Sequence, residues 1–399
     1  MTREHNFGLA GFERQLSDHE LTRDLAAFEQ AVVDIREFPP GNSKVVEACM
    51  EATLQDLHNE SFPEFNQTVL TFLRDRPDMS AHLKVQLFWR VFQHSLIKSS
   101  DNINYPADYA KVMTWQKAFR SILEDAPNAI NPDGWEVQEL LATHTVQTNE
   151  PRRYSGVKIA IDAYSDITGQ EPSYVDAGCS AGLGQIQIGE NIPFRGVNID
   201  TRKREVRHRV RSGLNKQISF SKIVGFDMIS GTSIEWVDAC SNPKELADTA
   251  RNRDRRKYRE HLGTHRKYYK RLHGDLSEGD PGIKAVMDEN NGQKYDVASA
   301  LTMLYEIPVD LQTKATKTLE YLSKCLVVVV DFAEISHEDP TQLITAKNIY
   351  APGSRYRLLA KELTGDNLNW QHLGTFDNGR CTSFKPEKIL LKRYVDLGL

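Results

Sequence analysis

The sequence is poor in cysteine and lacks any apolar run long enough to span a membrane. Its five cysteines are scattered and show neither C-x-x-C nor histidine-rich spacing: Cys49, Cys179, Cys240, Cys325 and Cys381. A disulfide framework and a structural zinc site are therefore disfavoured, and we expect no metal site. Since the polar N-terminus does not have the pattern of a signal peptide, we expect a cytoplasmic protein that does not insert into membranes.

An excess of basic charge is also absent. With 50 Lys and Arg against 55 Asp and Glu, the formal net charge is -5, which argues against a surface generally adapted to nucleic acid. A hydrophobic content of 40% and a charged content of 26% are typical of a soluble globular protein. At 399 residues, the chain is long enough for one large domain or two of ordinary size.

Strand patterns are missing from the first part of the chain, where apolar residues recur at helical spacing. Residues 21–33 and 45–57 show this spacing, and residues 83–96 are apolar enough for a buried helix. We therefore expect a helical N-terminal cap domain over residues 1–145. Its core should contain Trp89, Trp115 and His94. The remainder, residues 146–399, would form a second domain with a basic insertion around residues 200–285.

A glycine-rich stretch, SYVDAGCSAGLGQ at residues 173–185, is the most informative part of the sequence. It begins with the apolar pattern of a short strand that closes near Asp176, and a helix can begin at about Gln185. A strand that turns through glycines into a helix presents backbone N–H groups that can bind an anionic or polar ligand. Small residues in the turn allow that ligand to approach the backbone.

Several kinds of site use such a loop, and a glycine turn without function is a further possibility. The dinucleotide fingerprint G-x-G-x-x-G does not fit, because Ser180 stands where it needs glycine. Residues 178–182 match G-x-S-x-G, the nucleophile elbow of α/β-hydrolases. That alternative would make Ser180 the nucleophile, with Asp331 and either His337 or His372 completing a triad. It is the weaker one, because the helical first part lacks the strands that precede such an elbow.

Residues downstream of the loop supply the strands of a sheet. Residues 194–200 and 222–227 each have the pattern of a strand that closes on an acidic residue, Asp200 and Asp227. Residues 294–308 indicate a strand, a turn and an apolar segment, and residues 326–331 indicate a strand buried on both faces. Residues 389–395 are expected to form a further strand. Together these patterns predict an α/β fold with a Rossmann-like sheet.

Basic residues are concentrated in two segments, 202–216 and 251–271. In the first segment Arg207, Arg209 and Arg211 alternate strictly, which favours a hairpin with one basic face. The second segment interleaves arginine and lysine with tyrosine. Such segments are usually solvated surfaces, so contact with nucleic acid is the less favoured interpretation of both.

The segment TNEPRR at residues 148–153 joins the two expected domains. Thr148 or Asn149 can cap the amphipathic helix that follows, with Pro151 in its first turn. Alternatively, Asn149, Glu150 and Arg153 line a substrate pocket beside the glycine loop. The residues alone leave both possibilities open.

With these motifs in order, the C-terminal part resembles class I S-adenosylmethionine-dependent methyltransferases, whose first motif is an acidic residue followed by alternating small residues. Those positions are Asp176, Gly178, Ser180 and Gly182. More narrowly, residues 145–335 resemble an uncharacterised bacterial domain family with T-N-E…R and S-A-G-L motifs. The sequence departs from that family at Gly184, where it usually has asparagine, and at Asn242, where it has tryptophan. The resemblance implies S-adenosylmethionine as cofactor and a small-molecule methyl acceptor.

The resemblance also implies roles for individual residues. Asp176 and the loop of residues 178–182 would contact the methionine part of the cofactor. The ribose hydroxyls would be bound by Asp227, favoured over Asp200, and the adenine would lie near Asp275. Candidate general bases are Glu150, Tyr305 and Glu306, needed only if the acceptor must lose a proton. The remaining alternatives are a non-catalytic protein that binds a nucleotide or S-adenosylmethionine, and a nucleic-acid methyltransferase that uses the basic segments.

Overall fold

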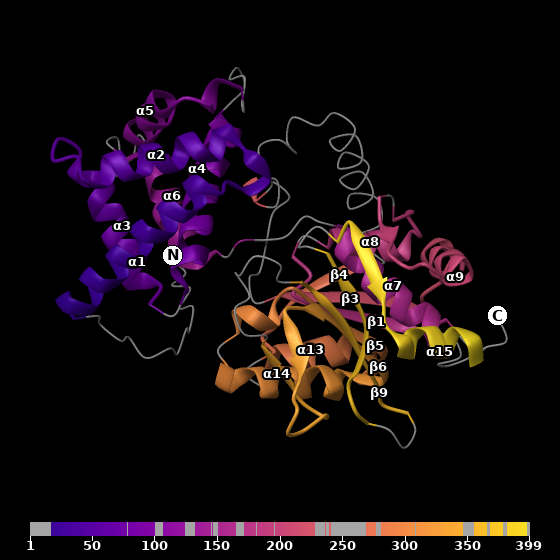
Figure 1. Ribbon diagram of the computed structural model, residues 1–399. Helices are drawn as coiled ribbons and strands as arrows, with labels where there is room; N and C mark the ends of the chain where they lie inside the picture. Colours follow the sequence, from indigo (N-terminus) through magenta and orange to yellow (C-terminus); the bar gives the residue numbers. More distant parts are fainter. Residues whose placement is uncertain are drawn as a thin grey trace. The chain divides into compact units, whose positions relative to one another are not determined.

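The computed structural model describes most of the chain, whose residues form two compact units (Figure 1). The described residues are 17–77, 79–99, 107–123, 132–144, 146, 151–164, 171–180, 182–194, 196–227, 236, 239–240, 269–276, 281–307, 309–345, 355–364, 368–377 and 381–396. The first unit contains Met1–Gln147 and Glu235–Asn252, and the second contains Thr148–Ile234 and Arg253–Leu399. The segment 235–252 therefore groups with the first unit, whereas the sequence analysis assigns it to the second domain.

In the first unit, the regular structure of the described residues 17–146 is helical. Its elements are α1 (Asp18–Glu37), η1 (Pro40–Asn42), α2 (Lys44–Leu57), α3 (Pro63–Asp75), α4 (Ala81–Ser99), η2 (Ala107–Tyr109), α5 (Val112–Leu123) and α6 (Pro132–Thr143). A capping box of Ser17 and Glu20 begins α1. The ring of Phe88 lies at the centre of the core, with four phenylalanine ring centroids between 5.0 and 6.4 Å away. As predicted, Trp89 and Trp115 are fully buried and His94 is nearly so.

A residue from far along the chain completes this core. Trp236 is buried in the first unit, where its ring lies 5.8 Å from that of His94 and 4.9 Å from that of His144. The side-chain amide of Gln93 donates a hydrogen bond to the carbonyl of Ala239 in the same segment. The connection between two strands of the second unit thus contributes an aromatic anchor to the first unit.

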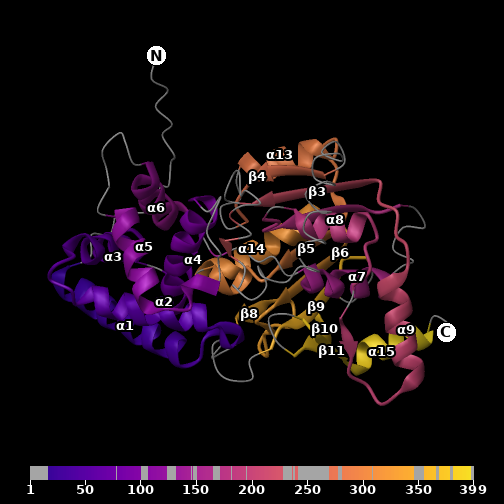
Figure 2. The same ribbon diagram turned by 90° about the horizontal axis from the view of Figure 1, so that it is seen from above.

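The second unit is built on a sheet that has nine strands among the described residues. In spatial order they are β2 (Asn198–Ile199), β11 (Ser383–Pro386), β10 (Gln371–Phe376), β9 (Arg357–Glu362), β6 (Ser323–Asp331), β5 (Tyr295–Leu301), β1 (Ser173–Ala177), β3 (Lys222–Asp227) and β4 (Tyr269–His273). A separate small hairpin consists of β7 (Ala333–Ile335) and β8 (Leu343–Thr345). Figure 2 follows the sheet from β4 and β3 through β5 and β6 to β9, β10 and β11.

One half of the sheet is parallel and has the order β4-β3-β1-β5-β6. After β1 the chain first forms β2 at the far edge of the sheet. It then adds β3 and β4 on one side of β1, and finally β5 and β6 on the other. This reversal of direction is the topological switch point of a Rossmann-like sheet. The predicted α/β fold with a Rossmann-like sheet is confirmed in this half. The strands of residues 173–176, 222–227 and 326–331 also occur where the sequence predicts them.

The other half of the sheet is antiparallel from β6 through β9 and β10 to β11, and β2 forms its edge. The strand expected at residues 194–200 is therefore short and lies far from β1. The strand expected at residues 389–395 is wrong, since α15 (Lys388–Asp396) occupies this region. Among residues 388–393 of α15, whose burial is described, only Leu390 is fully buried while Lys388, Ile389 and Lys392 are exposed, a pattern that suits a surface helix.

Helices cover both faces of the sheet (Figure 1). On one face lie α7 (Tyr154–Ala163), α9 (Arg204–Asn215) and α15, and on the other lie α13 (Pro281–Glu289) and α14 (Val309–Leu322). Side chains of β1 alternate between the two layers, so that Tyr174 packs with α7 while Val175 packs with α13 and α14. Asp176 follows Tyr174 by two residues and therefore points toward α7.

The hairpin predicted for the basic residues 202–211 is wrong. Residues 204–215 form α9, in which Val210 and Leu214 are buried and Val206 is half-buried. These apolar residues recur every four positions, which is the spacing of a helix face. The alternation of arginines at 207, 209 and 211 therefore does not indicate a strand.

Among the described residues, no helix combines the length and apolar character needed to cross a bilayer. All five cysteines are buried and none forms a disulfide.

Candidate functional site at the topological switch point

The carboxyl ends of β1 and β5 mark the switch point: α8 (Leu183–Gly189), which follows β1, packs against β3, whereas α14, which follows β5, packs against β5 and β6. In open α/β sheets ligands bind in the crevice that this divergence leaves. After β1 comes the glycine loop, residues 178–182, and then α8. The turn after β5 contains Thr302 and Met303 and leads into η4 (Leu304–Glu306).

The glycine loop has a backbone conformation that favours glycine. Gly178 has φ +69°, Ser180 has φ +51° and Gly182, the N-cap of α8, has φ +79°. The backbone N–H of Gly178 donates to the carbonyl of Phe226 in the neighbouring strand at 2.8 Å, which fixes the start of the loop. A Cβ on Gly178 would lie only 2.8 Å from Sδ of Met303, so glycine allows the two turns to approach each other.

Asp176, which closes β1, is fully buried and belongs to a hydrogen-bond network beneath the loop. Its carboxyl group accepts from Oη of Tyr154 at 2.6 Å and from Oγ of Ser299 at 2.8 Å. The hydroxyl of Tyr174 lies 2.7 Å from the same Ser299 Oγ. Burial raises the pKa of Asp176 to about 7, although both donated hydrogen bonds oppose the shift. Asp176 therefore joins β1, β5 and the N-terminus of α7 directly under the loop.

Two further predicted aspartates lie at the carboxyl ends of neighbouring strands. Asp227 closes β3, and its Oδ2 accepts a hydrogen bond of 2.9 Å from the backbone N–H of Ser180 in the loop. Asp275 follows β4 and comes directly after Gly274, whose N–H donates to the carbonyl of Asp227 at 3.1 Å. The structure thus places Asp176, Asp227 and Asp275 along three adjacent strand ends.

Asp200 is not brought to this site. It follows β2 at the opposite edge of the sheet, and five strands lie between β2 and β1. Its backbone N–H donates to the carbonyl of Phe384 in β11, and its side chain is exposed.

On the other side of the switch point, Arg153 contacts the turn after β5. Its Nη1 donates to Oγ1 of Thr302 at 2.8 Å, and its guanidinium lies over the ring of Tyr356, 5.0 Å from the centroid. The ring of Phe332 stacks on Tyr356 at 4.2 Å and meets Tyr305 edge-on at 5.5 Å. Arg153 and these rings form a cationic and aromatic wall, which brings two predicted residues, Arg153 and Tyr305, together.

Asp331, at the end of β6, orders the turn that carries Met303. Its Oδ2 accepts from the backbone N–H groups of Met303 and Leu304, and its Oδ1 accepts from that of Phe332. Burial raises the pKa of Asp331 to about 6. The side chain thereby fixes both the turn beside Gly178 and the start of the aromatic wall.

Some predicted residues cannot be placed. Asn149 and Glu150 lie outside the described residues, as do residues 251–268 of the second basic segment. Glu306 ends η4, and its side chain is likewise outside the description. Within the described part of the chain, no group of His, Cys, Asp or Glu has the arrangement of a metal site.

Sequence reasoning missed Gln185, a fully buried residue in the first turn of α8. A Cβ on Gly225 of β3 would lie 1.9 Å from its Nε2, so the amide packs directly on that strand. Neither amide atom has a hydrogen-bond partner in the part of the chain that the structure describes. Its sequence context, a polar residue early in a helix, gave no signal of burial.

The alternative of a hydrolase triad gains no support from the geometry. Both carboxylate oxygens of Asp331 accept from backbone N–H groups, and His337 is exposed. The Nε2 of His372 bonds within its own strand, to the carbonyl of Gly374 and to Thr375. That strand, β10, is separated from β1 by three others.

No protein-family model matches the chain, and no curated protein matches it in sequence. The narrower family resemblance therefore stays a prediction. Solved structures with a similar fold include the plantazolicin methyltransferase BamL in complex with a triazolic desmethylPZN analog and SAH. BamL is 13% identical with a TM-score of 0.25, over 46% of this chain and 46% of BamL, so the match spans about half the length of that protein.

A second similar structure is magnesium protoporphyrin IX methyltransferase (ChlM) from Synechocystis PCC 6803 with bound SAM. It is 12% identical with a TM-score of 0.25, over 70% of this chain and 94% of ChlM. The plantazolicin methyltransferase BpumL, in complex with SAH, is 12% identical with a TM-score of 0.23 over 63% of this chain and 59% of BpumL. These values describe a distant likeness of fold.

Proposed function

We propose that the protein is an S-adenosylmethionine-dependent methyltransferase that acts on a small molecule. One observation carries the proposal: at the topological switch point, a glycine loop between β1 and α8 is held against Asp227, the acidic residue that closes the adjacent strand. This combination brings a tight backbone loop and a carboxylate together on two adjacent strand ends, beside the switch point where nucleotides bind in Rossmann-like sheets. One ChlM structure holds the same cofactor.

The residues present fit such a cofactor. Glycine at position 178 lets the loop pack directly on Met303, so that the loop after β1 and the turn after β5 approach each other at the switch point. Asp227 already orders the loop through Oδ2, and a carboxylate can accept further hydrogen bonds, here from ribose hydroxyls. Asp275, after the next strand, would lie beside the adenine. Asp176 would position the loop from below, since it is engaged with Tyr154 and Ser299.

When bound, the cofactor supplies a sulfonium methyl group that is already activated for in-line displacement. The chain's own residues then have to align the acceptor and exclude water. The wall of Arg153, Tyr305, Phe332 and Tyr356 is suited to this, because flat rings shape an apolar surface and the guanidinium can bind an anionic or carbonyl oxygen. Tyr305 is a candidate base at this wall, and Asn149, Glu150 and Glu306 remain candidates for contact with the acceptor.

Isothermal titration with S-adenosylmethionine and S-adenosylhomocysteine tests the proposal. We expect both to bind, and we expect Asp227→Asn to weaken binding roughly 10- to 100-fold, as for loss of a hydrogen bond to a charged group. Asp200→Asn is the matched control, because it makes the same chemical change at the far edge of the sheet. Absence of binding by the wild type up to millimolar ligand, or equal loss in the two variants, would refute the proposal.

A further inference from the structure

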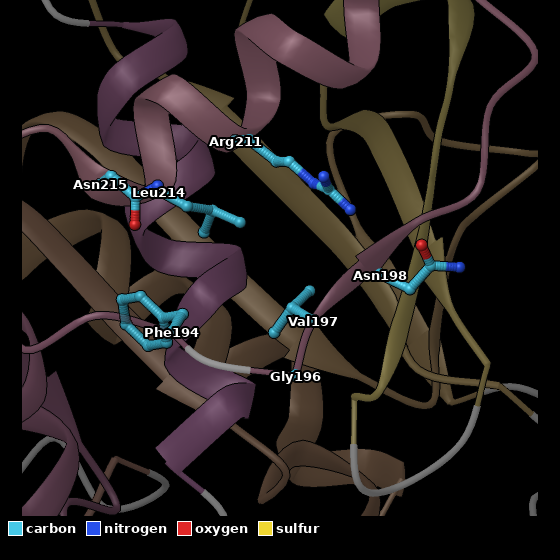
Figure 3. A pocket seen from close by; sticks show the side chains of 7 residues that line it. All are labelled: Phe194, Gly196, Val197, Asn198, Arg211, Leu214 and Asn215. Atoms are coloured by element: carbon cyan, nitrogen blue, oxygen red, sulfur yellow. The ribbon is translucent and has the colours of Figure 1, made fainter. Parts of the chain in front are cut away.

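A cavity of about 390 Å³ lies between α9 and the segment that leads into β2 (Figure 3). Its lining residues are Phe194, Gly196, Val197, Asn198, Arg211, Leu214 and Asn215. In Figure 3 the side chains of Val197 and Leu214 point toward each other across the floor, and the guanidinium of Arg211 extends over them. None of these residues belongs to the switch-point loops, so this cavity, the α9 pocket, has no role in the proposed methyl transfer.

The floor and the rim of the α9 pocket differ in chemistry. Phe194, Val197 and Leu214 are each less than 9% exposed and form an apolar floor. Arg211, Asn198 and Asn215 are exposed and supply a permanent positive charge and two amide groups at the rim. The pocket is open to solvent and is lined about equally by polar and apolar surface, which suits a small ligand with one flat apolar part and one charged group.

A second guanidinium approaches the same pocket. Gly196 has φ +78°, and a Cβ built on it would lie 3.6 Å from Nη1 of Arg152. Arg152 thus reaches the glycine side of the pocket, while Arg211 lies on the helix side. Arg211, at the exposed rim, favours an anionic ligand whose charged group is planar or tetrahedral, because the guanidinium fork binds carboxylate and phosphate with two hydrogen bonds. Arg152 adds to the positive charge on the glycine side.

The positive charge continues along α9 beyond the pocket. Arg204, Arg207 and Arg211 recur three or four positions apart and are exposed, so they form one stripe on the solvent face. Residues 202–216 contain seven lysines and arginines and one glutamate, although the whole chain has a net charge of -5. This local field attracts phosphates to the mouth of the pocket.

We propose that the α9 pocket binds a nucleotide, with the base on the apolar floor and the phosphate on Arg211. The nucleotide can be free or part of a single strand, because both present a flat base and a phosphate. In a strand, the neighbouring phosphates would lie along the stripe, on Arg204 and Arg207. A free nucleotide would need Arg211 and the floor alone.

Binding of adenosine 5′-monophosphate, adenosine and a labelled single-stranded oligoadenylate of about ten nucleotides tests this inference. Every titration is made in the Asp227→Asn background, in which the switch-point site is weakened while the α9 pocket is unchanged. We expect the monophosphate to bind at least tenfold more tightly than adenosine. Arg211→Ala should remove that advantage, and Arg211→Lys should restore part of it. Arg23→Ala, which deletes an exposed arginine of α1, is the matched control and should change nothing.

The oligonucleotide distinguishes the two sources. If it binds more tightly than the monophosphate, weakens as salt rises and is further weakened by Arg204→Ala, the ligand is a strand. If it binds no more tightly than the monophosphate and its affinity is unchanged by Arg204→Ala, the ligand is a free nucleotide. The inference is overturned if adenosine and its monophosphate bind equally, or if Arg211→Ala and Arg23→Ala have the same effect. Since Arg211 is exposed, thermal melting of each variant should match the wild type and exclude misfolding as the cause.

Discussion

Replacing Gly178 by alanine should destabilise the chain in two separable ways. Gly178 has φ +69°, and a residue with a Cβ in this conformation costs about 1–2 kcal/mol. Part of this is offset, since alanine lowers the entropy of the unfolded chain by about 0.4–1 kcal/mol. In addition, the new Cβ would lie 2.8 Å from Sδ of Met303, and overpacking of this kind costs about 1–3 kcal/mol. We therefore expect a total loss of about 2–4 kcal/mol.

Gly292→Ala separates the two contributions. Gly292 has φ +71°, almost the same as Gly178, but no heavy atom lies within 4 Å of the Cβ that would be added. The free energy of unfolding of Gly292→Ala should therefore fall by about 1 kcal/mol, from backbone strain alone. Urea unfolding of both variants, followed by circular dichroism under identical conditions, gives the difference that is due to Met303.

A double-mutant cycle with Met303→Ala identifies that difference directly. If the close contact is the cause, Gly178→Ala should be less harmful in the Met303→Ala background by about 1–3 kcal/mol. The affinity for S-adenosylmethionine should fall at least tenfold in Gly178→Ala, because the loop must move to accommodate the methyl group. Equal losses for Gly178→Ala and Gly292→Ala, with no coupling to Met303, would refute the reasoning.

Three further predictions concern buried groups. Burial raises the pKa of Asp176 from 3.8 to about 7, so between these pH values the folded chain keeps a proton that the unfolded chain has lost. The free energy of unfolding of the wild type should therefore fall as the pH rises from about 4 to about 7. Urea unfolding at several pH values should show that Asp176→Asn lacks this part of the pH dependence. Trp236→Ala should cost about 3–5 kcal/mol in thermal or urea unfolding, whereas Phe38→Ala, at a residue 81% exposed, should cost less than about 0.5 kcal/mol. Arg153→Ala and Thr302→Val should each lose the same hydrogen bond, so the double variant should be about 1 kcal/mol more stable than the sum of the single losses indicates.

The parallel half of the sheet could be predicted because its strands are buried on both faces. Such strands are continuous apolar runs, as in residues 326–331, and the sequence alone locates them, although β6 begins three residues earlier, at Ser323. The two errors concern surface elements, α9 and α15. Charged side chains outnumber apolar ones in α9, and in α15 the two kinds are about equally frequent. In a surface helix the spacing of exposed charged residues does not indicate the secondary structure, because a charged side chain can lie at any solvent-facing position. Only the few buried residues recur with the helical period.

The site could be predicted only in part, for a related reason. The aspartates that end strands are visible in the sequence because each follows an apolar run. The contacts of Arg153 with Thr302 and Tyr356 join positions about 150 and 200 residues apart along the chain, and no local pattern indicates them. Gln185 was missed because its burial results from the packing of α8 against Gly225 of β3, which no local sequence pattern indicates.

Asp200 and Asp227 show how burial, and not spacing along the chain, decides which acidic residue lies beside the glycine loop. A strand adjacent to β1 is covered on both faces, and β3 meets this condition because residues 223–226 are all buried. In β2, Asn198 is exposed and Ile199 is buried, which suits an edge strand with one face in solvent. Asp227 therefore lies beside the glycine loop, although it is further from Asp176 along the chain than Asp200 is. Equal weakening of S-adenosylmethionine binding by Asp200→Asn and Asp227→Asn would contradict this argument, because only Asp227 contacts the Ser180 amide.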